Sequence, residues 1–239
     1  MTAGVGGNGR DLPPGFRLRP ATAGDAPLVL ALTRDAYEEY RHALVPESGV
    51  FDETVGLVGA QLGGTEGVRV PAGPHGATVR GAASGDGIEA PRDEGHAPRS
   101  GGLIAFVDGV PVGCARWSVR TGDGDGRSAG SVAGEDRAGS AAGSDAVASE
   151  VPAAYLHVGR VAVVPAWRGR GVATALMGWF EELAASRGLA EIRLAVRLTL
   201  PRNEAFYRRL GYWPTGRLES REGFGPIAAW MSKRVPHPD

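Results

Sequence analysis

The sequence predicts an α/β (α+β) protein with a mixed, largely antiparallel sheet flanked by helices, and three observations lead to this prediction. The segment VAVVPAWRGRGVATALM at 161–177 joins an apolar, β-branched run to a glycine-rich turn and an amphipathic helix. The segment GLIAFVDGVPVGCARWSV at 102–119 has the pattern of a hairpin that turns at Asp108-Gly109. Residues 191–197 alternate apolar and charged side chains, which is the period of a strand with one buried face.

The N-terminal half is expected to supply a strand, two helices and the hairpin. FRLRPA at Phe16–Ala21 alternates as an edge strand does. Thr22 with Asp25 resembles a capping box, which would open a helix that reaches Tyr37. A second helix and the two hairpin strands are expected at 52–62, 103–107 and 110–119.

The C-terminal half is expected to continue the alternation of strands and helices. A helix that begins at Ala173 carries apolar side chains at helical spacing and ends near Gly188, which suits a C-terminal cap. In LPRNEAFYRRLGY at 200–212, Pro201 suits a first helical turn and Gly211 a helix end. Closing strands are expected at about 214–221 and 227–234, so the predicted order is β-α-α-β-β-β-α-β-α-β-β.

Composition and charge exclude several classes of protein. The chain has 239 residues, 42% of them hydrophobic, and a formal net charge of −1, which argues against a general nucleic-acid binder. There is no run of 18 apolar residues and no apolar core of a signal peptide, so we expect a cytoplasmic protein with no membrane partner. Cys114 is the single cysteine, which rules out an internal disulfide and a multi-cysteine zinc site, and no metal is expected.

Two low-complexity stretches interrupt the predicted elements. Residues at about 64–101 and 121–152 are poor in large apolar side chains and rich in Gly, Ala, Ser or Pro. Such segments cannot offset their chain entropy by burial, so we interpret both as inserts and residues 1–15 as a flexible N-terminus. A single domain over 16–235 follows, as a monomer or a homodimer.

The glycine-rich turn is typical of an anion-binding site. Gly169 and Gly171 allow the backbone to approach a ligand, and the first N–H groups of the following helix favour a phosphate. Arg168 and Arg170 add positive charge beside it. A dinucleotide fingerprint would need a third glycine where Thr174 stands, and a phosphate loop would need a Gly-Lys pair that the turn lacks. A tight strand-to-helix turn without a ligand is the alternative.

Two blocks of the sequence carry a resemblance to a known family. Arg168, Gly171 and Ala173 fit the pattern RxxGxG/A, which resembles the acyl-CoA pyrophosphate loop of the GNAT (GCN5-related) N-acetyltransferases. Asn203 and Tyr207 lie four residues apart on a short predicted helix just before a Gly-Tyr pair, which is similar to a second signature of that family. The predicted order of elements resembles that of the GNAT fold as well.

This resemblance implies an acetyl-CoA-dependent N-acetyltransferase. Acetyl-CoA would be the cosubstrate, and a primary amine of a small molecule or peptide would attack it directly in a ternary complex. Acetylation of protein amines and a catalytically silent acyl-CoA-binding module are the alternatives. The cofactor-binding residues that the resemblance implies are Val161, Ala162, Val163, Arg168, Gly169, Arg170, Gly171, Val172, Ala173, Thr174, Asn203 and Tyr207.

Amine acylation requires a base for the ammonium ion and a proton donor for the departing thiolate. The resemblance implies that Tyr207 is the acid, with packing against the cofactor as its alternative role. A backbone N–H on the strand, that of Val163, is expected to bond the thioester oxygen. His157, expected on the same strand face as Val161 and Val163, is the candidate base, and a structural histidine is the alternative. The resemblance implies candidate acceptor contacts at the end of the first helix, Glu38, Glu39, Tyr40 and His42, and a solvated helix end is the alternative.

Overall fold

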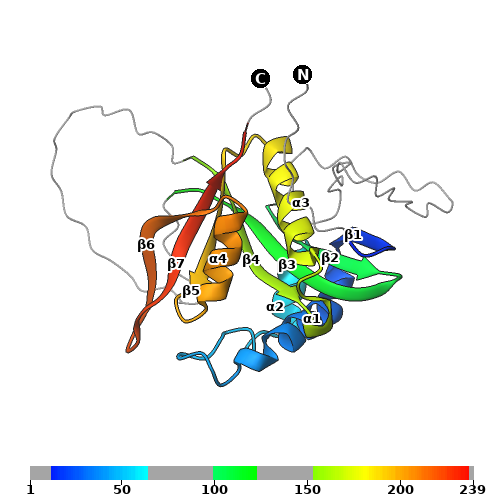
Figure 1. The fold of residues 1–239 in the computed structure, drawn as a ribbon, viewed down its shortest axis with the longest axis horizontal. Helices are drawn as coiled ribbons and strands as arrows, with labels where there is room; N and C mark the ends of the chain where they lie inside the picture. The colour runs from blue at the N-terminus through cyan, green and yellow to red at the C-terminus, as the bar shows by residue number, and fades with distance from the viewer. Residues whose placement is uncertain (1–11, 64–98, 123–152, 237–239) are drawn as a thin grey trace, which may run out of the picture.

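The computed structural model of the protein describes residues 12–63, 99–122 and 153–236. These residues form a seven-stranded sheet in the order β1-β2-β3-β4-β5-β7-β6. The helices and strands, in chain order, are β1 (Phe16–Ala21), α1 (Ala26–Tyr37), α2 (Val55–Leu62), β2 (Ser100–Val107), β3 (Val110–Arg120), β4 (Tyr155–Val163), α3 (Val172–Ser186), β5 (Glu191–Arg197), α4 (Pro201–Arg209), β6 (Trp213–Arg221) and β7 (Gly225–Arg234). This order confirms the one predicted from the sequence (Figure 1).

The sheet is antiparallel except between β4 and β5. These two strands pair in parallel at Leu156↔Ile192 and His157↔Arg193. A parallel pair needs a crossover connection, and α3 supplies it. No residue of β4 after His157 pairs with β5. The edge of β4 that faces β5 therefore makes no strand-to-strand hydrogen bonds beyond this point. We refer to Gly159–Val163, on the side that faces β5, as the open edge of β4.

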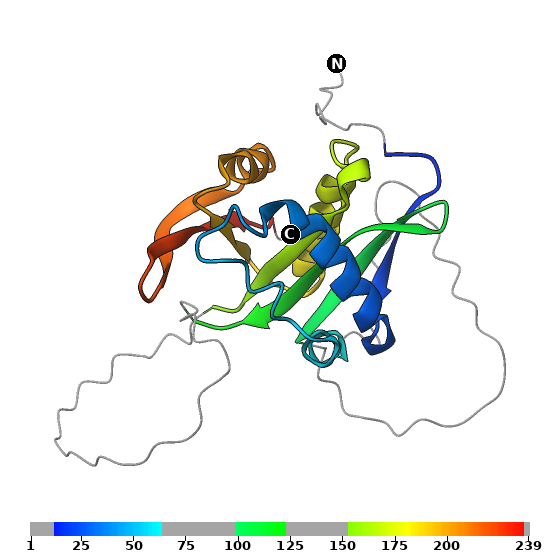
Figure 2. The same ribbon diagram turned by 90° about the horizontal axis from the view of Figure 1, so that it is seen from below.

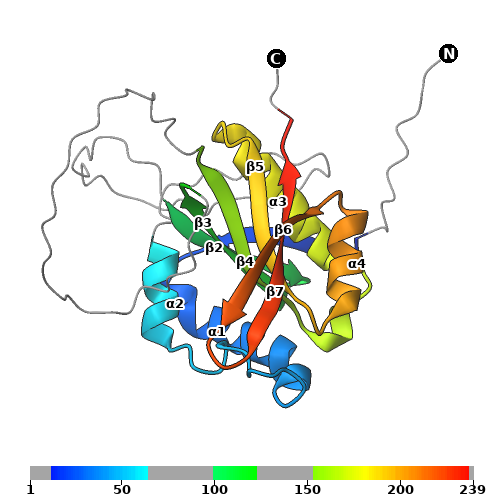
Figure 3. The same ribbon diagram turned by 90° about the vertical axis from the view of Figure 1, so that its left-hand side faces the viewer.

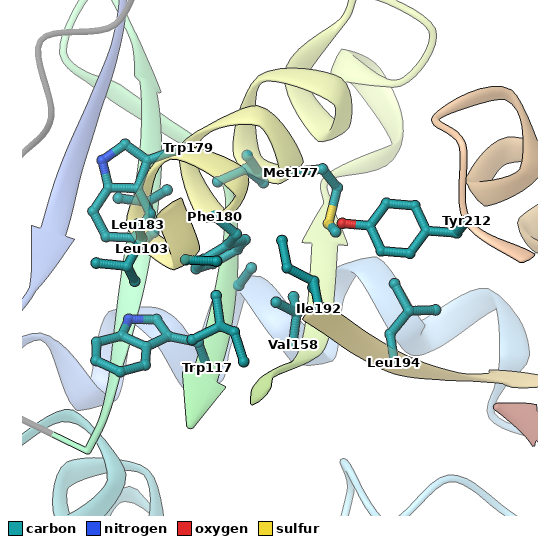
Figure 4. Packing of buried hydrophobic residues seen from close by; sticks show 14 of the residues in the cluster. Leu103, Trp117, Val158, Met177, Trp179, Phe180, Leu183, Ile192, Leu194 and Tyr212 are labelled. Carbon is teal, nitrogen blue, oxygen red and sulfur yellow. The ribbon is translucent and has the colours of Figure 1, made fainter. Parts of the chain in front are cut away.

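Helices cover the two faces of the sheet. In Figure 1, α3 lies in front of the strands, and α1 and α2 lie behind them. Figure 4 shows how Met177 and Phe180 of α3 pack against Val158 of β4 and against Ile192 and Leu194 of β5, within the larger buried cluster. On the other face, α1 and α2 bury a smaller cluster, whose strand residues are Ala21, Ile104, Cys114 and Ala162. Apolar burial on both faces is the main force that holds β4 in the middle of the sheet.

Local sequence signals account for most element boundaries. The side chain of Thr54 accepts a hydrogen bond from the Leu57 N–H at 3.3 Å, so α2 begins at Val55 and not at 52 as expected. The hairpin turns at Asp108 (φ 49°) and Gly109 (φ 81°), the two positive values that a type I′ turn requires.

The predicted inserts are described only at their ends. β2 begins at Ser100, so the last two residues of the stretch assigned to 64–101 belong to the sheet. The remainder of that stretch up to residue 98, residues 123–152 of the second one, and residues 1–11 of the N-terminus lie outside the described residues. The single domain over 16–235 therefore stays a prediction.

Candidate active site at the open edge of β4

The open edge of β4 presents backbone groups that no neighbouring strand uses. The Val164 N–H donates to the Val112 carbonyl of β3 at 3.0 Å. Because successive N–H groups of a strand point to opposite sides, the Val163 N–H points away from β3, toward β5. The Val163 carbonyl lies on the same side and accepts a hydrogen bond from Arg168 Nε at 3.1 Å. A donor suitable for an acyl oxygen is thus available at this edge.

A bulge in β4 overturns one expectation about His157. Arg116 of β3 pairs with Gly159 and Cys114 pairs with Ala162, so β4 has one residue more than β3 between these pairs. Arg160 adopts a left-handed backbone (φ 53°) at this point. The extra residue reverses the alternation of side chains along the strand. The prediction that His157 shares a face with Val161 and Val163 was therefore wrong.

His157 faces the α1 side of the sheet, whereas Val161 and Val163 pack into the core on the α3 side. Its ring lies 5.5 Å, between centroids, from the ring of Trp230. Burial first, and then the charges of Arg120 and Arg160, lower the pKa of His157 to about 3. His157 is consequently a neutral imidazole at physiological pH, able to accept a hydrogen bond but holding a proton weakly.

The glycine-rich turn forms a backbone cradle at the start of α3. Gly169 and Gly171 have φ values of 72° and 81°, in the left-handed region that favours glycine. The N–H of Ala175 makes the first bond of the helix, to the Gly171 carbonyl at 2.9 Å. The N–H groups of the preceding residues, Val172 to Thr174, have no helical partner and are available to an anion.

The side chain of Arg168, expected to add positive charge beside the anion, binds three protein groups. Its Nη2 donates to the Ala36 carbonyl at 2.9 Å, its Nη1 pairs with Glu39, and its Nε binds the Val163 carbonyl. Arg168 therefore joins the end of α1 to the end of β4 and to the glycine turn. Glu39, expected at the acceptor, is one of its partners. Arg170 lies over the ring of Trp167, with its guanidinium carbon 5.0 Å from the centroid.

Tyr207 of α4 is a half-buried phenol beside the core. Its ring makes edge-to-face contacts with Phe206 (centroids 5.0 Å apart) and Tyr212 (5.9 Å). Burial raises its pKa well above the usual value, and the nearby Tyr37 raises it further. In the part of the chain that the structure describes, its hydroxyl has no hydrogen-bond partner. Tyr207 is thus a protonated donor, and Asn203 lies one helical turn before it.

Sequence reasoning missed a buried charged group that adjoins Tyr37. Glu53 binds Arg116 Nη2 through Oε2 at 2.6 Å and Arg160 Nε through Oε1 at 2.8 Å. Arg116 also donates to Gln61 Oε1 at 2.7 Å. The side chains of Arg116 and Glu53 are only 6% and 13% exposed, so this is an interior network. An arginine between Ala115 and Trp117 in an otherwise apolar strand is the sequence signal that could have indicated it.

The segment 38–54 after α1 contacts the end of β5. In Figures 2 and 3 it lies beside the β6–β7 hairpin, and Arg197 Nη2 of β5 donates to the Pro46 carbonyl within it. Glu38, expected at the acceptor, pairs with Arg41 at 2.8 Å. Tyr40 is half-buried and His42 is exposed, so both stay candidate acceptor contacts.

Two negative findings apply to the described residues. No group of three or more His, Cys, Asp or Glu side chains among them could hold a metal ion. None of the helices in these segments is long and apolar enough to cross a membrane.

Comparison with known proteins identifies the family. The sequence model of the Acetyltransferase (GNAT) family matches residues 80–212, more than half of the chain. None of the curated proteins compared with the chain matches it. The chain belongs to the GNAT acetyltransferase family, and it is therefore an acyltransferase that acts as an N-acetyltransferase.

The fold is similar to that of solved acetyltransferases. The PaiA N-acetyltransferase from Thermoplasma acidophilum, in complex with coenzyme A, has a TM-score of 0.54 at 13% identity, over 92% of this chain and 98% of that one. NAA60 from Arabidopsis thaliana, in complex with a bisubstrate analogue, has a TM-score of 0.54 at 12% identity, over 92% and 99%. The ribosomal-protein-S18-alanine N-acetyltransferase from Escherichia coli has a TM-score of 0.51 at 12% identity, over 94% and 96%. At these identities the similarity shows a shared fold.

Proposed function

We propose that the protein transfers the acetyl group of acetyl-CoA to the primary amine of a small molecule by direct attack in a ternary complex. One observation carries this proposal. The open edge of β4 leads into the turn before α3, whose first N–H groups form the backbone cradle, and it offers an unused N–H at Val163. A thioester laid along this edge would have a phosphate site at one end, and we propose that Tyr207 of α4 supplies the proton donor.

The cofactor would lie along the open edge. The N–H groups of Val172, Ala173 and Thr174 would bind the pyrophosphate, aided by the positive end of the helix dipole. Gly169, Arg170 and Gly171 would shape the cradle, and Arg168 would hold it against α1 and β4. The pantetheine arm would follow Val161, Ala162 and Val163, with Asn203 binding it or ordering a water. A neighbour in this fold, the Thermoplasma protein, was solved with coenzyme A.

The chemistry requires polarisation of the thioester carbonyl and protonation of the sulfur. The Val163 N–H would donate to the carbonyl oxygen, where negative charge develops as the amine attacks. The carbon–nitrogen bond forms, the carbon–sulfur bond breaks, and the Tyr207 hydroxyl would donate its proton to the departing sulfur. A raised pKa keeps Tyr207 protonated until that step.

The amine must lose a proton, and His157 is the proposed group that receives it through water, since His157 lies six residues along β4, roughly 15–20 Å, from Val163. His157 lies where β4 and β5 last pair, on the α1 side, which is also the side of the segment 38–54. Glu53 is a poorer candidate because two arginines share its carboxylate. With a pKa of about 3, His157 would pass the proton to water and would not store it.

Tyr207→Phe tests the assignment of the acid. We expect kcat for acetyl transfer to fall by about 100-fold, the usual contribution of general acid catalysis, while the Kd of acetyl-CoA from calorimetry changes by less than about twofold. Tyr212→Phe is the matched control, because its hydroxyl is buried, has no hydrogen-bond partner in the described chain, and points in Figure 4 toward Met177 in the core. Equal rates in wild type and Tyr207→Phe would reduce Tyr207 to a packing residue.

CoA release across a panel of amines tests the activity itself. Turnover with small amines supports the proposed function. Turnover only with protein or peptide amines would move the acceptor to that class. Tight acetyl-CoA binding without release of CoA in the presence of any amine would indicate a catalytically silent binding module.

A further inference from the structure

Arg160 presents a guanidinium whose two terminal nitrogens are unused. It lies in the β4 bulge, and only its Nε is engaged, at 2.8 Å from Glu53 Oε1. Neither Nη atom has a hydrogen-bond partner among the described residues, and the side chain is 35% exposed. Nη2 lies 3.8 Å from the position that a Cβ of Gly49 would occupy, so the segment 38–54 passes beside it without a side chain in between.

Arg197, at the end of β5, is a second arginine with an unused donor, and unlike Arg160 it has no carboxylate partner among the described residues. Its Nη2 donates to the Pro46 carbonyl, and its Nε is buried with no hydrogen-bond partner in the described residues. Burial lowers the pKa of Arg197, the charge of Glu219 raises it and that of Arg221 lowers it. A partly buried cation without a carboxylate partner is costly, so Arg197 is a position at which an anion would be stabilised.

Arg160 lies on β4 and Arg197 on β5, and both follow the last residue pair of these two strands. The last pair of these strands is His157↔Arg193, and Arg160 and Arg197 follow it by three and four residues. At about 3.3 Å per residue, each lies roughly 10–13 Å beyond the last pair. Both contact the segment 38–54, Arg160 through Glu53 and Arg197 through Pro46, so both face the proposed acceptor side.

Several carboxylates near the two arginines are already paired with other arginines, whereas Glu47 and Asp52 of the segment 38–54 have no ion pair among the described residues. In the segment 38–54, Glu38 pairs with Arg41 and Glu39 pairs with Arg168. Glu53 is shared by Arg116 and Arg160, which leaves one positive charge in that group. On the strands, Glu191 pairs with Arg193. The pKa of Arg197 is raised by the charge of Glu219 and lowered by that of Arg221.

We infer that the amine acceptor carries a carboxylate close to its amino group, as an amino acid does, and that Arg160 and Arg197 bind this carboxylate. The inference rests on the proposed function and names its substrate class. Guanidinium groups bind carboxylates through charge-assisted hydrogen bonds, while polyamines and other cationic acceptors are repelled. The carboxylate would satisfy donors that the folded chain leaves unused and would hold the amine between the separated parts of β4 and β5.

The experiment compares amino acids with their carboxamides, which keep the amine and lose the negative charge. Initial rates of CoA release are measured with wild type, Arg160→Met and Arg197→Met. We expect wild type to prefer the acid over the amide by about 10- to 100-fold in kcat/KM, through KM, because a hydrogen bond to a charged group is lost in the amide. Either variant should bring this ratio close to one while the rates with amides stay unchanged.

Two further variants separate recognition from structure. Arg17→Met removes an exposed arginine from β1, at the opposite end of the sheet from β5, and should leave the ratio unchanged. Arg197→Lys keeps the positive charge and should retain most of the preference. An unchanged thermal midpoint of each variant shows that the fold is intact. If Arg160→Met unfolds the protein, the acid-to-amide ratios of Arg197→Met and Arg197→Lys decide whether the carboxylate site exists.

The outcomes distinguish this inference from the proposed function. Acetylation of amides and acids at equal rates by wild type overturns the carboxylate site and leaves the acetyltransferase intact. Turnover of polyamines or of peptide amines alone overturns it as well. If the protein releases no CoA with any amine, calorimetry measures whether an amino acid binds to the protein saturated with CoA. Binding that is lost in Arg197→Met supports the site, and absence of binding overturns it.

Discussion

Lowering the pH from 7 to 5 should destabilise the protein through His157, and His157→Phe should remove that loss. The ring lies against Trp230 on the α1 side of the sheet, and burial depresses its pKa to about 3 from 6.5. Between these two values the unfolded chain binds a proton that the folded chain does not bind. Stability is therefore complete above pH 6.5 and decreases as the pH falls toward 3.

The magnitude follows from linkage. Each pH unit below 6.5 costs about 1.4 kcal/mol of folding free energy, so wild type should lose about 2 kcal/mol between pH 7 and pH 5. Phenylalanine keeps an aromatic contact with Trp230 and does not titrate. Asp25, whose pKa is held at about 2 mainly by a hydrogen bond from Arg19, loses its contribution only below about pH 4, outside this window.

Urea unfolding followed by tryptophan fluorescence at pH 5, 6 and 7 measures the effect. The quantity that matters is the difference in pH dependence between wild type and His157→Phe, because all other titrating groups are common to both. A difference of about 2 kcal/mol over the two pH units is expected. Parallel pH dependence would refute the reasoning, since it would mean that His157 is protonated in the folded state and does not lie in the buried position that the β4 bulge defines.

Two glycine substitutions test the site and its support. Gly171→Glu should abolish CoA binding, measured by calorimetry. The control is Gly188→Glu at the other end of α3: its φ of 65° is similar, so the backbone strain should be comparable, but CoA should bind normally. Unchanged CoA affinity in Gly171→Glu would rule out the cradle. Gly113→Ala should destabilise the fold by about 1–3 kcal/mol, because its Cβ would lie 2.7 Å from the Ala162 carbonyl oxygen. Gly178→Ala, where a Cβ meets nothing within 4 Å, should instead raise the thermal midpoint; equal midpoints for these two variants would contradict the strand packing.

The neutral state of His157 bears on mechanism as well as on stability. A base with a pKa near 3 does not produce an inflection near pH 6.5 in the rate profile. The pH dependence of kcat/KM should then follow the ionisation of the acceptor amine. The burial that makes His157 a weak base also keeps its imidazole neutral. The ring can therefore accept a hydrogen bond at the last pair of β4 and β5.

Local features of the site could be predicted from the sequence because neighbouring residues determine them. The turn at Gly169 and Gly171 follows from the positive φ that glycine accepts readily, and it leads directly into the helix that it caps. The hairpin at Asp108-Gly109 is specified by its own two residues. The order of strands and helices follows from hydrophobic periods of two and 3.6 residues, which act over a few residues at a time.

The features that the sequence could not supply depend on residues far apart in the chain. The bulge at Arg160 exists only as a mismatch between β3 and β4, and it turns His157 to the face opposite the one that simple alternation predicts.

The partners of Arg168 on α1 and the sharing of Glu53 by two arginines arise from contacts across more than 60 residues, and no local pattern encodes them. The sequence alone indicated the family, the glycine turn before α3 and the place of Tyr207 on a short helix. Only the tertiary structure decided which charges are already paired and which donors, at Arg160 and Arg197, have no partner among the described residues.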